Sequence, residues 1–133
     1  MRSPTALIRL KMVRIEQRQR MVAQIQGAIA DFELQTTNLN LEIREVEERT
    51  KNYDPAHFAY STFAKAAIQR RDNLERSADN LKIQLDAAKT ALGDAKDELE
   101  AVTRMLEIDL IRDQSPIIPS KRGRPIANLV GAI

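Results

Sequence analysis

The stretch that decides the fold is residues 74–106, LERSADNLKIQLDAAKTALGDAKDELEAVTRML. Leucine, alanine and valine recur in it with alternating spacings of three and four residues, and the alternation extends back to residue 64. The core positions of this run are Ala64, Ala67, Arg71, Leu74, Ala78, Leu81, Leu85, Ala88, Leu92, Ala95, Leu99, Val102, Leu106 and Asp109. Only Arg71 and Asp109 are polar, and a heptad pattern sustained over this length is typical of a coiled coil.

A second heptad run precedes the first and has the same length. Its core positions are Ile8, Lys11, Ile15, Arg18, Val22, Ile25, Ile29, Phe32, Thr36, Leu39, Ile43, Val46, Thr50 and Tyr53. Two matched runs in one chain can cover each other if the chain turns back between them. The sequence therefore predicts an all-α fold, a long antiparallel two-helix coiled-coil hairpin whose helices are each roughly 70 Å long.

Helix-start signals set the expected boundaries of the hairpin. Ser3 precedes a proline, which suits an N-cap followed by the first helical residue. Asp54–Pro55 repeats this signal, and Ser61 offers another start for the second helix. The predicted hairpin, residues 1–112, comprises a helix over about 4–52, a hinge over about 53–62 and a helix over about 63–112, followed by a flexible tail over 113–133.

A register that sets large side chains against small ones predicts which residues face each other. It places Tyr53 over Ala64 and Leu39 against Ala78, which allows close interdigitation. The same register puts the basic start of the chain beside the acidic residues at the end of the second run. Because those basic charges have acidic neighbours in the same molecule, the pattern disfavours a nucleic-acid partner on this face.

Composition excludes several classes of function. The chain has 133 residues, 30% of them charged, with no cysteine and a single histidine. Disulfides, thiolate chemistry and a histidine metal site are therefore not expected. No glycine-rich phosphate loop or Ser/His/Asp arrangement is present, so we expect neither enzyme activity, catalytic residues nor a cofactor. The first residues lack an apolar run long enough for a signal peptide or membrane span, which predicts a cytoplasmic protein without membrane insertion.

The hinge gathers the aromatic side chains. Residues 53–63 read YDPAHFAYSTF and hold four of the five rings of the chain: Tyr53, Phe58, Tyr60 and Phe63. Two helices cannot bury all of them. Either the rings fold into a plug that closes the turn, or they present an exposed anchor for a partner, the role in which aromatic residues are enriched. His57 is either a polar surface residue or a pH-sensitive contact.

The open end of the hairpin, opposite the hinge, is more apolar than the heptad seam requires. The excess residues are Leu7, Leu10, Met12, Val13, Met105, Ile108, Leu110 and Ile111. Such an exposed patch is typical of a partner surface. Two alternatives stay open: the C-terminal residues fold over the patch, or two hairpins associate there.

The last residues, DQSPIIPSKRGRPIANLVGAI, contain three prolines and show no sustained period. We expect a flexible segment. The motif KRGRP, at Lys121–Pro125, resembles the core of an AT-hook, in which arginines enter the minor groove of DNA. A basic tail without a nucleic-acid role is the simpler interpretation of so short a motif.

The RLK start at Arg9–Lys11 and the hinge sequence DPAHFAYSTFAKAAIQRRDNLERSADNLKIQL resemble flagellar type III export stalk proteins, the FliJ family. The likeness covers about residues 5–112. It implies a non-enzymatic, cytoplasmic coiled-coil stalk, peripheral at the cytoplasmic face of the export apparatus, which links the export ATPase ring to the cytoplasmic domain of the export gate. Export chaperones are further implied partners.

By position, the resemblance assigns a partner to each end of the hairpin. The ATPase ring would meet Leu7, Arg9, Leu10, Lys11, Met12, Met105 and Ile108, and the gate would meet Tyr53, His57, Phe58, Tyr60 and Phe63. Two other functions stay open on the residues alone: a scaffold that self-associates through its open end, and a DNA-associated protein that uses the KRGRP motif.

Overall fold

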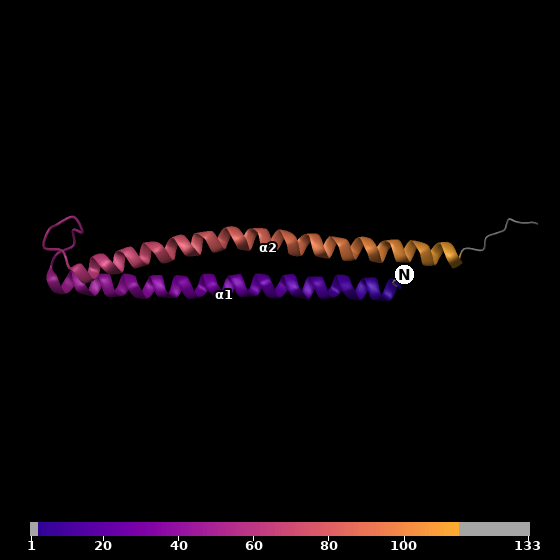
Figure 1. The fold of residues 1–133 in the computed structure, drawn as a ribbon, viewed down its shortest axis with the longest axis horizontal. Helices are drawn as coiled ribbons and strands as arrows, with labels where there is room; N and C mark the ends of the chain where they lie inside the picture. The colour runs from indigo at the N-terminus through magenta and orange to yellow at the C-terminus, as the bar shows by residue number, and fades with distance from the viewer. Residues whose placement is uncertain (1–2, 115–133) are drawn as a thin grey trace, which may run out of the picture. The chain divides into compact units, whose positions relative to one another are not determined.

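The computed structural model describes residues 3–114 and consists of two α-helices. Helix α1 spans Pro4–Thr50 and helix α2 spans Thr62–Gln114. The two helices pack against each other in opposite directions and are joined by a loop over residues 51–61 (Figure 1). The predicted all-α two-helix hairpin is confirmed. The first helix ends two residues before its predicted end, and the second extends two residues beyond it.

Local capping explains where each helix begins and ends. The Ser3 hydroxyl accepts a hydrogen bond from the Ala6 amide at 3.1 Å, as the sequence predicts. Helix α2 begins behind Ser61, whose hydroxyl accepts from the Ala64 amide at 3.2 Å. Asp54–Pro55 therefore lies in the loop and starts no helix. Helix α1 stops because Lys51 adopts a φ of 60°, the left-handed conformation that commonly ends helices.

The chain divides into two compact units, each described by itself here. The loop unit comprises residues 15–94 and includes the turn between the helices. The end unit comprises the described residues 3–14 and 95–114. The predicted flexible tail and its KRGRP motif lie outside the described residues, apart from the first two positions of that tail, Asp113 and Gln114, which belong to α2.

The loop unit contains nearly all the buried apolar side chains of the described chain. They are Ile25, Ile29, Leu39, Ile43, Val46, Tyr60, Ala64, Ala67 and Ala78. All except Tyr60 occupy heptad core positions, so the predicted seam is confirmed here. Two clusters form this core: Leu39 and Ile43 with Ala67, and Val46 with Tyr60 and Ala64. Large residues of α1 thus pack on alanines of α2, as expected of close helix packing.

The predicted pairing of Tyr53 with Ala64 is wrong. Val46, one heptad earlier than Tyr53, packs with Ala64, and Tyr53 is exposed. The helices are therefore shifted by one heptad relative to the predicted register near the turn. The physical reason is the loop: α1 ends at Thr50, and Tyr60 folds back to complete the layer that Tyr53 was expected to close.

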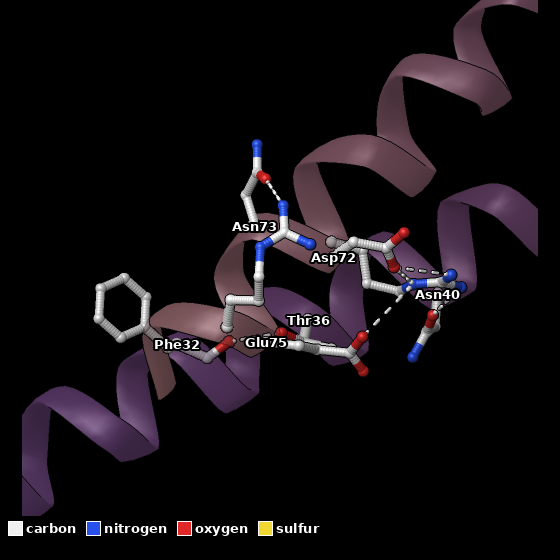
Figure 2. A network of polar contacts seen from close by, with 8 residues as sticks. Phe32, Thr36, Asn40, Asp72, Asn73 and Glu75 are labelled. Atoms are coloured by element: carbon white, nitrogen blue, oxygen red, sulfur yellow. Dashed lines mark hydrogen bonds and ion pairs between the residues drawn. The ribbon is translucent and has the colours of Figure 1, made fainter. Parts of the chain in front are cut away.

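Arg71 places a polar contact inside this seam. Its guanidinium donates to Asn40 Oδ1 on α1 at 3.2 Å and to Asp72 Oδ1 at 3.1 Å (Figure 2). Its Nε atom also lies 4.0 Å from a Glu75 carboxylate oxygen. A polar residue at a core position that finds its partner in only one register is a device for fixing that register.

The end unit has a thinner core. Ala95 is its one buried apolar residue among those described, while Ile8, Leu99 and Leu106 are half-buried. An ion pair joins its helices: Lys11 Nζ lies 3.4 Å from Glu98 Oε2. The predicted placement of basic residues of the first helix beside acids of the second is confirmed at this pair. Neither helix, over residues 3–114, has a stretch apolar enough to cross a bilayer.

Candidate functional site

Short-range hydrogen bonds shape the first half of the loop between the helices. Asn52 Oδ1 accepts from the Asp54 amide at 3.2 Å, and Asp54 Oδ1 accepts from the Ala56 amide at 3.0 Å. The Asp54 carbonyl accepts from the His57 amide at 3.0 Å. Asparagine and aspartate favour turns because their side chains bond the backbone two residues on. The loop therefore has a defined shape of its own.

His57 organises the second half of the loop. Its Nδ1 atom accepts from the Ala59 amide at 3.0 Å and lies 3.3 Å from Asn52 Nδ2. The Ala59 amide is an N–H donor, so Nδ1 acts as the acceptor in that contact. The imidazole also stacks on the Phe58 ring, with centroids 4.7 Å apart. His57 is exposed, as expected of a polar surface residue, and its ring contacts both the loop backbone and Phe58.

Tyr60 anchors the loop to helix α1. Its side chain is only 4% exposed, and its hydroxyl donates to Glu47 Oε2 at 2.7 Å. Burial, followed by the hydrogen bond and the negative charge of Glu47, raises the pKa of Tyr60 to about 12, against a smaller lowering by Arg71. The expectation that Tyr60 presents an exposed ring is therefore wrong. It takes the role of the plug.

The three remaining rings are exposed: Tyr53 and Phe58 lie in the loop, and Phe63 is the second residue of α2. We call these three residues the exposed loop surface. Phe58 is 92% exposed, and more than half of Tyr53 and of Phe63 is exposed. The prediction that the rings cannot all be buried is confirmed, and the two proposed roles are divided among them. Tyr60 closes the turn, while the other three are exposed.

The predicted residues of the open end separate into two groups. Arg9, Met12, Met105 and Ile108 are exposed. Leu7, Leu10 and Lys11 are half-buried, and the Lys11 amine is already paired with Glu98. Met105, Ile108 and Ile111 recur every third residue of α2 and are each more than half exposed. We call these three the end strip. The expected apolar patch is thus present, and α2 contributes its largest part.

A groove in the end unit was not foreseen. It has a volume of about 550 Å³ and is lined by Pro4, Thr5, Ile8, Thr103, Leu106, Glu107, Asp109, Leu110 and Asp113. We call it the end groove. The sequence carried a signal for it: Asp109 stands at a core position of the heptad run, where a charged side chain cannot close the seam.

A second groove lies in the loop unit. It has a volume of about 540 Å³ and is lined by Glu33, Thr36, Thr37, Glu75, Ala78, Asp79 and Lys82. The small side chains of Thr36 and Ala78 leave this space. Lys82 Nζ lies 3.4 Å from Glu33 Oε2 across the groove. Within residues 3–114 no cluster of acidic or histidine side chains is arranged to hold a metal ion.

Compared with known proteins, the chain has no significant match to a protein-family model, a curated protein or a solved structure.

Proposed function

We propose that this protein is a non-enzymatic stalk of the bacterial flagellar type III export apparatus, located at its cytoplasmic face and involved in motility. The hairpin links the export ATPase ring to the cytoplasmic domain of the export gate, and it assists export chaperones. The RLK start and the hinge sequence, which resemble the FliJ family, motivate the proposal. The two-helix fold agrees with it.

The observation that carries the proposal is the exposed loop surface. Three aromatic rings are exposed: Tyr53 and Phe58 on the loop, and Phe63 at the start of α2. The shape of the loop is fixed by its own hydrogen bonds and by Tyr60. Exposing aromatic rings is unfavourable unless a partner covers them. A preformed loop loses little conformational entropy on binding, so its rings make efficient anchors.

Direct binding to purified partners tests the proposal. We expect the full chain to bind the gate domain, and Phe58→Ala combined with Phe63→Ala to weaken that binding at least tenfold, as loss of anchor residues does. The matched control is Ile83→Ala, which removes an equally exposed apolar side chain from α2 away from the loop. Binding of the wild-type chain to neither the gate domain nor the ATPase, with normal motility in a deletion strain, would refute the proposal.

The open end provides a second arm of the same test. Met105→Ala with Ile108→Ala should weaken binding to the ATPase and leave binding to the gate unchanged. The loop variants should do the reverse. Equal losses for both partners with either pair would contradict the assignment of one partner to each end.

Self-association is the second candidate function, and the end strip favours it. Apolar side chains that recur along one helix can pair with the same strip of a second copy. Sedimentation velocity over a wide range of protein concentration decides between the two. A monomer at all concentrations excludes the scaffold, whereas a dimer that Ile108→Asp dissociates supports it.

A further inference from the structure

The end groove combines an apolar floor with an acidic rim. Ile8 and Leu106 are half-buried at its base, and Leu110 is more than half exposed beside them. The described lining also carries three carboxylates, Glu107, Asp109 and Asp113, and no basic side chain. Such a lining favours a ligand that offers apolar side chains together with positive charge, because both kinds of surface are then covered.

Residues 115–133 have the complementary composition. Ile117 and Ile118 stand near the start of this segment, and Lys121, Arg122 and Arg124 follow within a few residues. The segment has no acidic side chain. Its chemistry thus matches the groove in both respects.

Residues 115–133 are covalently attached next to the end groove, and this attachment favours their binding to it. Residue 115 directly follows Gln114, the last residue of α2, and Asp113 already lines the groove. The groove residues of α2 run from Thr103 to Asp113, a distance of roughly 15 Å along the helix at 1.5 Å per residue. An extended chain covers that distance in about five residues. A tethered segment also acts at an effective concentration in the millimolar range, so even weak intrinsic binding fills the site.

We propose that residues 115–133 bind in the end groove of their own chain, with apolar side chains against Leu106 and Leu110 and basic side chains against the three carboxylates. This proposal does not depend on a role in export.

Paramagnetic relaxation on the full chain tests the contact. The chain has no cysteine, so Ser120→Cys carries a single spin label. We expect the amide signals of groove residues to lose most of their intensity when the spin label is oxidised and therefore paramagnetic. The signals of residues 64–78 should keep their intensity. The loss should persist on dilution. Unchanged groove signals would overturn the proposal.

A mixed sample separates the chain's own segment from that of a second copy. An isotope-labelled chain without spin label is mixed with an unlabelled chain that carries the label at position 120. Because the proposed contact is intramolecular, the groove signals should stay intact in this mixture. Their loss would show that a neighbouring molecule supplies the segment and would overturn the proposal as stated.

Charge reversal tests the acidic rim. Glu107→Lys with Asp113→Lys should restore most of the signal intensity at the groove. The charge-matched control, Asp97→Lys with Glu100→Lys, changes exposed residues of the end unit outside the groove and should restore none. Raising the salt concentration to about 1 M, where the Debye length falls to about 3 Å, should act in the same direction as the rim variant. Equal effects of both variants would contradict a groove-specific contact.

Discussion

The loop unit and the end unit use the same heptad pattern with different results. In the loop unit, isoleucine, leucine and valine of α1 are buried against alanines of α2, and Tyr60 closes the last layer. In the end unit the described seam is half-buried, and much apolar surface lies outside it. Heptad spacing therefore specifies which face of each helix packs against the other helix. The sizes of the side chains and the local turns of the chain decide how much of that face is buried.

The largest expected difference concerns single core residues. Ile43 is 6% exposed within the Leu39–Ala67 cluster, and Met105 is 64% exposed. Ile43→Ala should destabilise the protein by about 2–4 kcal/mol, because it removes buried methyl groups and leaves a cavity. Met105→Ala should change stability by no more than about 0.5 kcal/mol. Urea denaturation followed by circular dichroism measures the change in stability of both variants. Equal losses of stability would contradict the difference between the two units.

The next largest effect tests the closure of the loop. Tyr60→Phe removes the hydroxyl that donates to the Glu47 carboxylate and should cost about 1.5–3 kcal/mol at pH 7, as hydrogen bonds to charged groups do. The control is Tyr53→Phe, which changes an exposed tyrosine of the same loop and should be neutral. A neutral Tyr60→Phe would show that the ring alone anchors the loop.

The same pair of variants predicts a pH dependence. The pKa of Tyr60 in the folded protein is about 12, against an ordinary value of 10.0, so the neutral phenol stabilises the fold below pH 10. This contribution is lost as the pH rises from 10 through 12, because the unfolded chain ionises first. The stability advantage of wild type over Tyr60→Phe should therefore shrink by about 1.4 kcal/mol or less at pH 11. An advantage that grows with pH would contradict the assignment.

The smallest expected effect is a difference in coupling energy between two ion pairs of equal length. Lys11–Glu98 in the end unit and Lys82–Glu33 in the loop unit are both 3.4 Å long, but the Lys11 side chain is 17% exposed and that of Lys82 is 53% exposed. Double-mutant cycles should give about 0.5–1 kcal/mol for the first pair and a smaller coupling for the second, since solvent screens exposed charges. A larger coupling energy for Lys82–Glu33 than for Lys11–Glu98 would indicate that burial does not determine the strength of these ion pairs.

The sequence predicted the helices and the seam because heptad spacing is a direct consequence of helix geometry. It did not predict the register. A shift by one heptad again places core positions against core positions, so the seam pattern cannot distinguish Tyr53 from Val46 as the neighbour of Ala64. The deciding contacts are the left-handed Lys51 and the fold-back of Tyr60, which depend on the three-dimensional path of the loop.

The candidate sites, too, could be predicted only in part from the sequence. The sequence placed the aromatic residues in the hinge and the apolar excess at the open end, because all of them except Tyr53 lie outside the heptad core positions. Composition could not predict which of the four rings is buried and which three are exposed. Tyr60 and Phe58 lie only two residues apart in a segment without helical or strand periodicity, so no pattern distinguishes them. The end groove was missed because it arises from space between two helices, and only Asp109 marked it in the sequence.

Native-state hydrogen exchange tests the central claim most directly, because it reports the stability of each segment separately. The account predicts that amides of residues 39–46 and 64–74 exchange slowest, in a single cooperative unfolding step. Amides of residues 5–14 and 99–110 should exchange much faster, through local opening. Uniform protection along both helices, or slower exchange in the end unit than in the loop unit, would contradict the difference on which both proposed surfaces rest.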